Sequence, residues 1–363
     1  MFNHVVYHKL RNALSRKLEA LEGRLFHNLE DTLNQMVKRP MELHLELTNI
    51  CNARCIFCPY PFQQRPESIM ADTIFYKAVD SFVQIGGGRV GLTPVVGDAL
   101  IDPQFLKRVK YIRQFPEITE ILLTTNAILM DRFGVEEILK SGITAITIST
   151  SGFDKESYER IYRSTQYERM KNNVTKLFKK NHELGNPVNL KIVIRTDRSL
   201  NQVLTDVDFQ PIKRFNPNMD VALAYSNGGG KIKDGDLPAS MKFRWARKKK
   251  EPCVNLYHGP FVYWDGKVGA CFCVTSMDAG KALYIGNLVQ EQLLDIWVGK
   301  LMNDIRNQFY SKGTLNEICA KCDAYVNLDL FRTKEGRERA ELNSNKLRDY
   351  LQVTPVKKLK NVD

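Results

Sequence analysis

Short runs of alternating apolar and polar residues recur along the first 230 residues and predict β-strands. In the first run, residues 41–47, an apolar side chain stands at every second position. Helix-length segments separate the runs, and one of these helices is expected over residues 72–85. The strands are expected near residues 43, 90, 121, 146, 191 and 222. Strands that alternate with helices form a parallel sheet, so the pattern predicts an α/β fold with six βα units.

The two ends of the chain are expected to lie outside this repeat. Leucines recur at near-helical spacing in residues 1–40, and we favour packing on the sheet over a partner-binding or membrane-surface helix. These leucines are Leu10, Leu14, Leu18, Leu21 and Leu25. The predicted organisation is an N-terminal helical segment (1–40), a core (41–240), a small cysteine-rich domain (241–330) and a basic C-terminal tail (331–363).

Charge and hydropathy narrow the class of protein. The 363 residues carry a net charge of +12, which favours an acidic partner such as phosphate, carboxylate, nucleic acid or an anionic membrane surface. No apolar run approaches the roughly 20 residues that cross a bilayer, so no membrane span is expected. The N-terminus lacks the uninterrupted apolar region of a secretory signal. We therefore expect a cytoplasmic protein whose thiols stay reduced.

The eight cysteines fall into two groups and predict two metal sites. Cys51, Cys55 and Cys58 follow the first predicted strand with the spacing C-x3-C-x2-C, and the other five cysteines lie after residue 250. A structural zinc ion normally takes four protein ligands, and no histidine stands close to this triplet. Three thiolates suit an iron–sulfur cluster with one iron left open. A zinc knuckle or a chance spacing is the alternative.

The triplet and its position after a strand resemble the signature of the radical S-adenosylmethionine (SAM) superfamily. The resemblance implies a partial (β/α)6 TIM-like barrel with the triplet at its mouth. It implies a catalytic 4Fe–4S cluster on the three cysteines and SAM on the open iron. It also implies a 5′-deoxyadenosyl radical that takes hydrogen from the substrate, and a reducing electron donor of the flavodoxin or ferredoxin type.

Other segments resemble the SAM-binding motifs of this superfamily. Residues 97–99 resemble the Gly-Glu-Pro segment with Asp and Ala in its second and third places, and residues 125–127 resemble Thr-Asn-Gly with Ala in its third place. The implied SAM-binding residues are Phe57, Gly97, Asp98, Asn126, Ser149, Ser151 and Arg163. Each has a plain structural alternative: core packing for the ring, a turn for the Gly-Asp pair, surface or helix-capping positions for the serines and solvation for the arginine.

The segment after residue 240 resembles the twitch-type auxiliary domain, a reduced form of the SPASM extension. It opens with six cations within residues 242–250 and continues with a predicted hairpin that turns at Asp265–Gly266 and an amphipathic helix over residues 284–306. The resemblance implies one auxiliary 4Fe–4S cluster. Its ligands would be Cys253, Cys271, Cys319 and Cys322. Four cysteines that end in C-x2-C also make a closed zinc site, which stays the alternative.

Cys273 is left over from both ligand sets. It is a buried small residue, a substitute for Cys271 as ligand, or a catalytic hydrogen-atom donor like the cysteine that radical epimerases of this superfamily use.

The resemblance implies an oxidoreductase or epimerase acting on a small polar substrate. A carbohydrate- or aminocyclitol-like molecule is favoured, with an anionic group suggested by the charge of the chain. The first alternative is a radical SAM maturase that modifies a peptide or protein. The second, from another class, is a zinc-bound nucleic-acid-binding protein. The leading interpretation has no nucleic-acid partner.

Overall fold

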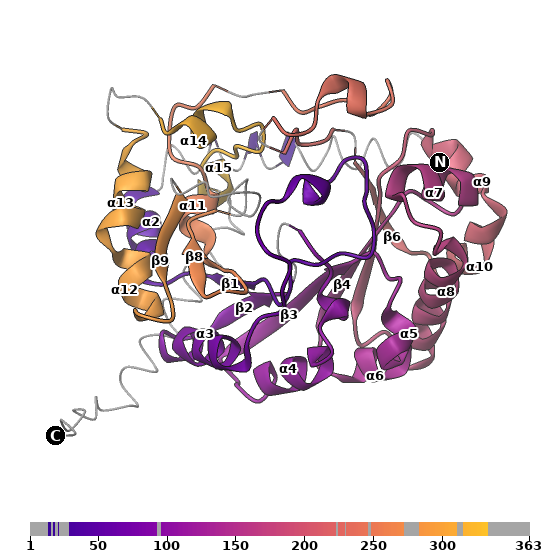
Figure 1. Ribbon diagram of the computed structural model, residues 1–363, viewed down its shortest axis with the longest axis horizontal. Helices are drawn as coiled ribbons and strands as arrows, with labels where there is room; N and C mark the ends of the chain where they lie inside the picture. The colour runs from indigo at the N-terminus through magenta and orange to yellow at the C-terminus, as the bar shows by residue number, and fades with distance from the viewer. Residues whose placement is uncertain are drawn as a thin grey trace.

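Nine strands form one continuous sheet in the part of the chain that the structure describes (Figure 1). This computed structural model describes residues 14–15, 17–18, 21, 29–92, 96–222, 224–228, 230–245, 248–271, 283–310 and 315–332. The sheet order is β6-β5-β4-β3-β2-β1-β7-β8-β9. The strands are β1 Glu42–Leu45, β2 Gly88–Gly91, β3 Ile118–Thr125, β4 Ala145–Thr150, β5 Asn189–Ile194, β6 Asn218–Val221, β7 Phe261–Val262, β8 Lys267–Gly269 and β9 Tyr284–Asn287.

Strands β1 to β6 are parallel and follow each other in chain order, as predicted. Helices lie along the outer side of the curved sheet, and the result is a partial (β/α)6 barrel (Figure 1). The described helices are α2 Leu29–Lys38, α3 Asp72–Gln84, α4 Phe105–Ile112, α5 Met130–Phe133, α6 Val135–Lys140, α7 Lys155–Tyr162, α8 Tyr167–Glu183, α9 Leu200–Thr205, α10 Gln210–Lys213, α11 Asn255–His258, α12 Leu293–Val298, α13 Lys300–Asn307, α14 Glu317–Lys321 and α15 Asp329–Arg332.

The core lies between the sheet and these helices. Strand β4 buries Ile146, Ile148 and Thr150, which alternate along the strand and therefore share one face. Helix α8 buries Met170 and Leu177 among the residues of a stripe that repeats every three or four positions. The two periodicities fit the strand–helix alternation of the sequence. The apolar face of the strand and that of the helix belong to one hydrophobic cluster.

The sixth strand ends earlier than expected. Strand β6 stops at Val221, just before residue 222, near which the strand was expected. The residues that follow turn instead, because Asn227 accepts backbone hydrogen bonds from Gly230 and Ile232, each at 3.0 Å. A Gly-rich segment has little preference for an extended strand and favours a turn. The apolar residues before it therefore did not continue the strand that their pattern predicted.

The C-terminal strands extend the barrel sheet. Strand β7 lies beside β1 and runs parallel to it, while β8 and β9 add antiparallel. The predicted hairpin is confirmed, because β7 and β8 pair across the turn at Asp265–Gly266. The predicted helix over residues 284–306 is wrong in two respects. Its first residues form β9, and Gly299 adopts an extended conformation that separates α12 from α13.

The predicted N-terminal helix only partly packs on the rest of the molecule. Helix α2 buries Leu33 and Met36, and the Trp297 indole N–H donates to the Met36 carbonyl oxygen at 3.2 Å. By contrast, the stripe leucines that the structure describes are exposed, namely Leu14, Leu18 and Leu21. Leu10 and Leu25 lie outside the described residues. Within the described ranges, no helix is long and apolar enough to cross a membrane.

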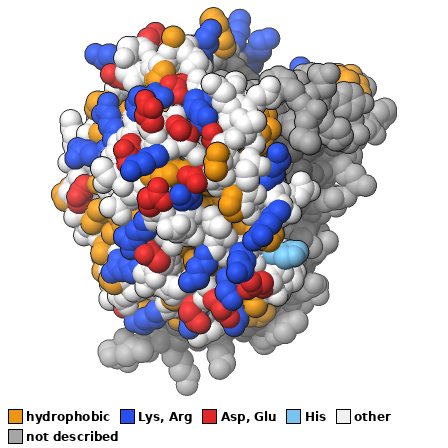
Figure 2. All heavy atoms as spheres, turned by 90° about the vertical axis from the view of Figure 1, so that its right-hand side faces the viewer, with side chains coloured by type: hydrophobic (Ala, Val, Ile, Leu, Met, Phe, Trp, Pro, Cys, Tyr) orange, Lys and Arg blue, Asp and Glu red, His pale blue; other side chains and the backbone are white. Residues whose placement is uncertain are grey.

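Basic and acidic side chains are interleaved on the face formed by α7 to α10 (Figure 2). Several of them form ion pairs, including Arg160 with Asp197 and Lys180 with Glu183. The excess positive charge of the chain is therefore not gathered into a basic patch on this face.

Candidate active site

The cysteine loop, residues 48–59, follows the carboxyl end of β1. Two backbone hydrogen bonds hold this loop against the last turn of α7. The Arg54 N–H donates to the Tyr162 carbonyl oxygen at 3.1 Å, and the Ile56 N–H donates to the Ile161 carbonyl oxygen at 3.0 Å. The positions of the three cysteines thus depend on both β1 and α7.

A cavity of about 290 Å³ opens beside this loop at the carboxyl ends of the parallel strands. Its walls come from the ends of five successive strands, β1 to β5, and from α7. This is the edge where parallel α/β sheets bind ligands. The lining residues are Cys51, Cys55, Phe57, Cys58, Pro59, Val96, Gly97, Asp98, Thr124, Thr125, Asn126, Ser149, Tyr162 and Arg195.

Asp98 ties the loop after β2 to the end of β3. Its carboxylate accepts hydrogen bonds from the Thr125 hydroxyl at 2.8 Å, the Asn126 N–H at 2.9 Å and the Leu100 N–H at 3.1 Å. Burial raises the pKa of the Asp98 carboxyl, and these donors oppose that shift. A ligand ammonium at Asp98 would therefore share a carboxylate that already holds two strand ends together.

Gly97 allows this segment to approach the cysteine loop. Its φ of +99° lies in the left-handed region, and a Cβ at this position would collide with the Thr48 carbonyl oxygen. The next residue, Asp98, donates its backbone N–H to the Ile50 carbonyl oxygen at 2.9 Å. Gly97 is thus required by the backbone path as well as by its place in the cavity wall.

Asn126 connects the end of β3 to the first cysteine. Its side-chain amide donates to Asn52 Oδ1 at 2.6 Å and lies 3.9 Å from Cys51 Sγ. Ala127, which stands where the superfamily motif has Gly, has a φ of +63°. This segment therefore keeps the left-handed turn of a glycine with an alanine in its place.

Ser149 and Arg195 form a polar part of the cavity wall. The Ser149 hydroxyl lies 2.8 Å from the Tyr162 hydroxyl and accepts a hydrogen bond from Arg195 Nε at 3.2 Å. The Arg195 guanidinium carbon lies 5.2 Å from the centre of the Phe57 ring. Sequence reasoning missed Arg195, although its place directly after β5 puts it at the same sheet edge as the other motifs.

Two predicted SAM-binding residues are not brought to the cavity. Ser151 is fully buried, and its hydroxyl has no hydrogen-bond partner among the described residues. Arg163 is exposed at the C-terminal end of α7, with a φ of +46°. Neither lines the cavity. Cys273, the predicted hydrogen-atom donor, lies outside the described residues. Phe57, Gly97, Asp98, Asn126 and Ser149 all line the cavity.

The second group of cysteines surrounds a small apolar cavity beside α14. Cys253, Cys271, Cys319 and Cys322 line it together with Lys249 and apolar residues. Asn316 caps α14 by accepting the Cys319 N–H at 2.9 Å, and its side-chain amide donates to Cys319 Sγ at 3.4 Å. All four predicted ligands therefore face one space, although they come from three separate segments.

The thiols of both sites are buried, and the effect of burial on their pKa values outweighs that of the nearby cations, Arg195 at the first site and Lys249 at the second. Burial raises the pKa of Cys51 to about 12, with the Asp98 carboxylate adding to the shift, and raises the pKa of Cys55 and Cys58. Burial likewise raises the pKa of Cys253 to about 12 and of Cys319 to about 11. Buried thiols become thiolates when a metal binds, so these donor sets suit metal groups.

Neither group of sulfurs is compact enough for a single zinc ion. In the part of the chain that the structure describes, no three of these sulfurs lie within 4.8 Å of one another. Four thiolates around one zinc ion would lie roughly 3.8 Å apart, given Zn–S bonds of about 2.3 Å. Cysteine thiolates are also the ligands that hold iron–sulfur clusters, which agrees with the donor chemistry of both groups.

Two family matches cover the two cysteine sites. Residues 45–200 match the Radical SAM superfamily, and residues 253–323 match the SPASM iron–sulfur cluster-binding domain. The chain belongs to the radical SAM superfamily. The predicted cofactors of this radical SAM enzyme, 4Fe–4S clusters and SAM, follow from the two matches. Iron–sulfur domains at both cysteine groups favour the enzyme over the zinc-bound nucleic-acid-binding alternative.

The curated relatives match only part of the radical SAM chain. GTP 3′,8-cyclase of Pasteurella multocida (strain Pm70) is 28% identical over 180 residues, which are 48% of this chain and 52% of the relative. The chain thus spans about half the length of the curated relatives that it matches.

Solved structures share the fold over most of the chain. The crystal structure of Streptococcus suis SuiB bound to precursor peptide SuiA has a TM-score of 0.56 and 14% identity, and covers 90% of this chain and 78% of SuiB. The crystal structure of BtrN in complex with AdoMet and 2-DOIA has a TM-score of 0.50 and 15% identity, and covers 78% of this chain and 93% of BtrN. These likenesses confirm the predicted fold class.

Proposed function

We propose that this radical SAM enzyme removes a hydrogen atom from a C–H bond of a small polar substrate, carbohydrate- or aminocyclitol-like, and dehydrogenates or epimerises it. One observation carries the proposal. Three cysteines, the Arg195 cation and a set of polar side chains face a single cavity at the carboxyl ends of the strands. Such a cavity suits a cofactor that has both apolar and charged groups, with a small substrate beside it.

The residues of the cavity divide the work of binding. Cys51, Cys55 and Cys58 would hold the catalytic 4Fe–4S cluster. When bound, this cluster and SAM supply the one-electron cleavage that yields a hydrogen-abstracting radical. Arg195 offers a cation to an anionic group of cofactor or substrate. Phe57 provides an apolar surface for an adenine ring and excludes water from that side of the cavity.

Dehydrogenation and epimerisation require different partners for the substrate radical. Dehydrogenation removes one further electron and one proton, and so needs an electron acceptor. Cys253, Cys271, Cys319 and Cys322 would hold an auxiliary cluster with that chemistry. Epimerisation needs a second hydrogen atom, for which Cys273 is the candidate donor. Full turnover by a Cys273→Ala variant that still cleaves SAM would exclude the donor role.

Similarity supports a small substrate with an anionic or nucleotide part. BtrN, whose structure contains 2-DOIA, shares the fold over 93% of its length. The GTP 3′,8-cyclases, named for a phosphorylated nucleotide, share sequence over about half of theirs. The net charge of +12 also favours an anionic substrate.

A peptide or protein substrate is the second candidate. The fold likeness to SuiB, which was solved with a precursor peptide, covers 90% of this chain. A short peptide that co-purifies with the protein and gives up hydrogen to the cofactor would favour this candidate over the small substrate.

The experiment is anaerobic reconstitution with iron and sulfide, followed by dithionite and SAM. Dithionite takes the place of the flavodoxin- or ferredoxin-type donor that we propose. The wild type should form 5′-deoxyadenosine, and deuterium from the correct labelled substrate should appear in that product. Cys51→Ala should abolish 5′-deoxyadenosine while retaining the auxiliary iron. A reconstituted wild type that binds iron but never cleaves SAM would contradict the proposal.

A further inference from the structure

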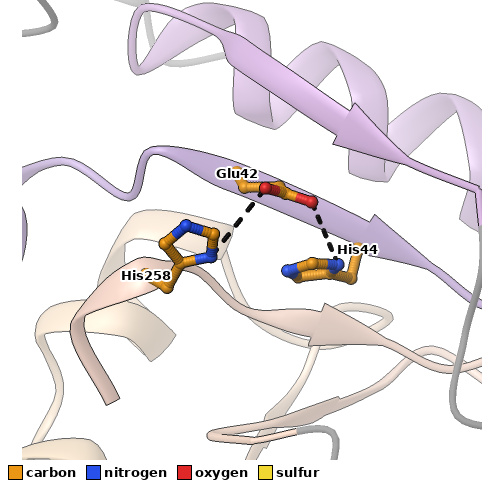
Figure 3. Close-up of side chains that lie close together, drawn as sticks. All are labelled: Glu42, His44 and His258. Atoms are coloured by element: carbon orange, nitrogen blue, oxygen red, sulfur yellow. Dashed lines mark ion pairs between the residues drawn. The ribbon is translucent and has the colours of Figure 1, made fainter. Parts of the chain in front are cut away.

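Glu42, His44 and His258 form a cluster near the amino end of β1 (Figure 3). Glu42 and His44 come from β1, and His258 is the last residue of α11. The cysteine loop follows the other end of the same strand, and none of the three residues lines either cysteine cavity. The cluster is therefore separate from both iron–sulfur sites.

The donor atoms of this cluster are close to the spacing that a transition-metal ion needs. Both imidazoles turn Nδ1 toward the Glu42 carboxylate, with His44 Nδ1 at 3.4 Å from Oε1 and His258 Nδ1 at 3.8 Å from Oε2 (Figure 3). One donor atom from each residue can be chosen so that all lie within 4.8 Å of one another. Tetrahedral zinc with nitrogen and oxygen ligands places neighbouring donors roughly 3.4 Å apart.

The fold holds these side chains in place. The Met41 N–H donates to the His258 carbonyl oxygen at 2.9 Å, so the end of α11 is joined to the start of β1. Gly259 makes this approach possible, because a Cβ there would collide with the Glu42 carbonyl oxygen. The His44 ring stacks on Phe261 with 4.0 Å between ring centres and 2° between planes. An ion would therefore meet rings that are already oriented.

Charge and solvent access are compatible with an ion. The Glu42 side chain is 5% exposed, whereas those of His44 and His258 are 16% and 23% exposed, so an ion and a water ligand can reach the histidine side. Arg89 Nη2 lies 2.6 Å from Glu42 Oε2 and neutralises part of its charge. This leaves Oε1, beside His44, as the metal-facing oxygen, and the arginine should make binding weaker than at a thiolate site.

We propose that Glu42, His44 and His258 bind one divalent transition-metal ion of the zinc class, with water completing the shell. Two histidines and a glutamate form a known type of zinc donor set. The ion would brace the first barrel strand against the α11–β7 segment, which precedes Cys271. This proposal does not depend on the proposed function, because it concerns a structural ion away from the SAM cavity.

The test uses the whole untagged protein with its iron–sulfur clusters reconstituted, so that the cysteines are occupied. After incubation with zinc chloride and desalting, the wild type should retain one zinc per chain. X-ray absorption at the zinc edge should show a shell of nitrogen and oxygen without sulfur. Zinc should also raise the midpoint temperature of unfolding, because it binds the folded state.

His258→Ala should lose the retained zinc and the thermal shift, while His182→Ala, at an exposed histidine on α8, should keep both. His258→Gln, which preserves more of the packing, is the second variant in case His258→Ala does not fold, and it should lose the zinc as well. A sulfur shell, no retained zinc in the wild type, or unchanged zinc in a folded His258 variant would overturn the proposal.

Discussion

Arg195 is fixed by two neighbours of different chemistry. Its Nε donates to the Ser149 hydroxyl, and its guanidinium lies over the Phe57 ring. Its Nη groups make no hydrogen bond to another described residue, although Arg195 lines the cavity. A guanidinium in a cavity wall whose Nη donors make no hydrogen bond to another described residue is suited to bind a carboxylate or phosphate.

We predict that Arg195→Gln weakens SAM binding at least 10-fold. A hydrogen bond to a charged group contributes about 1.5–3 kcal/mol, and about 1.4 kcal/mol corresponds to a factor of ten. Arg163→Gln is the matched control, because Arg163 was expected from the sequence to contact SAM but lies exposed outside the cavity wall. Equilibrium dialysis of SAM with both reconstituted variants makes the comparison.

The opposite ranking of these two variants would contradict this reading of the cavity. If Arg163→Gln loses SAM and Arg195→Gln binds normally, the exposed arginine closes over the cofactor when it binds. Iron content, measured on the same samples, separates loss of SAM from loss of the cluster.

Tyr225 gives the chain a sensitivity to alkaline pH. Burial raises the pKa of its phenol from 10.0 to about 12. Between these values the unfolded chain has released the proton and the folded chain retains it, so stability falls as pH rises from about 10 to about 12. Tyr225→Phe should make this fall shallower. Urea unfolding of the variant and the wild type at several pH values in this range measures it, and parallel curves would contradict it.

At the scale of single elements, the short helix α14 is tied to the second cysteine site by its N-cap residue, Asn316. Asn316 accepts the Cys319 N–H with its side-chain oxygen and donates to Cys319 Sγ with its side-chain nitrogen. The residue therefore both starts the helix and contributes a hydrogen bond to a ligand sulfur. Hydrogen bonds to cysteine sulfurs tune the reduction potential of an iron–sulfur cluster.

Variants of Asn316 should separate these two roles. Asn316→Ala removes the cap and should cost about 1 kcal/mol of folding free energy. Asn316→Asp keeps an oxygen that can cap the helix but removes the donor to sulfur, so it should preserve the stability and lower the potential of the auxiliary cluster. Chemical denaturation and an anaerobic redox titration followed by electron paramagnetic resonance measure the two effects. An unchanged potential in a stable Asn316→Asp variant would exclude the tuning role.

The repeat of strands and helices was predictable from the sequence because its period is local. The residues that the structure places in the cavity wall were less so. Arg195 follows a strand as Asn126 and Ser149 do, but no motif singled it out. The position of Ser151 shows the limit of pattern reasoning: it stands two residues beyond Ser149, just after the end of β4, and is buried outside the cavity wall. Which side chains meet depends on the path of the chain after the strand, and the sequence does not specify that path locally.

At the scale of the molecule, barrel and C-terminal segment share one sheet. The outer edge of β1 receives its partners from residues after 250: His44 donates its N–H to the Pro260 carbonyl oxygen at 3.0 Å, and Glu46 to the Val262 carbonyl oxygen at 2.9 Å. Without these partners β1 would become an edge strand with unpaired backbone groups, which is a template for self-association.

We therefore predict that a chain ending at residue 240 self-associates more than the full chain does at the same concentration. Size-exclusion chromatography with light scattering over a range of concentrations tests this. A shortened chain that keeps the mass distribution of the full chain and a folded circular-dichroism spectrum would show that β1 does not need its C-terminal neighbour.

The seam between β1 and β7 also limits how such proteins can be recombined. A chimera that exchanges everything after residue 240 with a relative replaces one side of this seam and must reproduce its register, including the glycine that lets the two backbones touch. A chimera in which the exchanged segment begins after β7 keeps β1 and β7 from the same protein, so their pairing is unchanged. An exchanged segment should therefore begin inside the cysteine-rich segment, after β7, and not at residue 240.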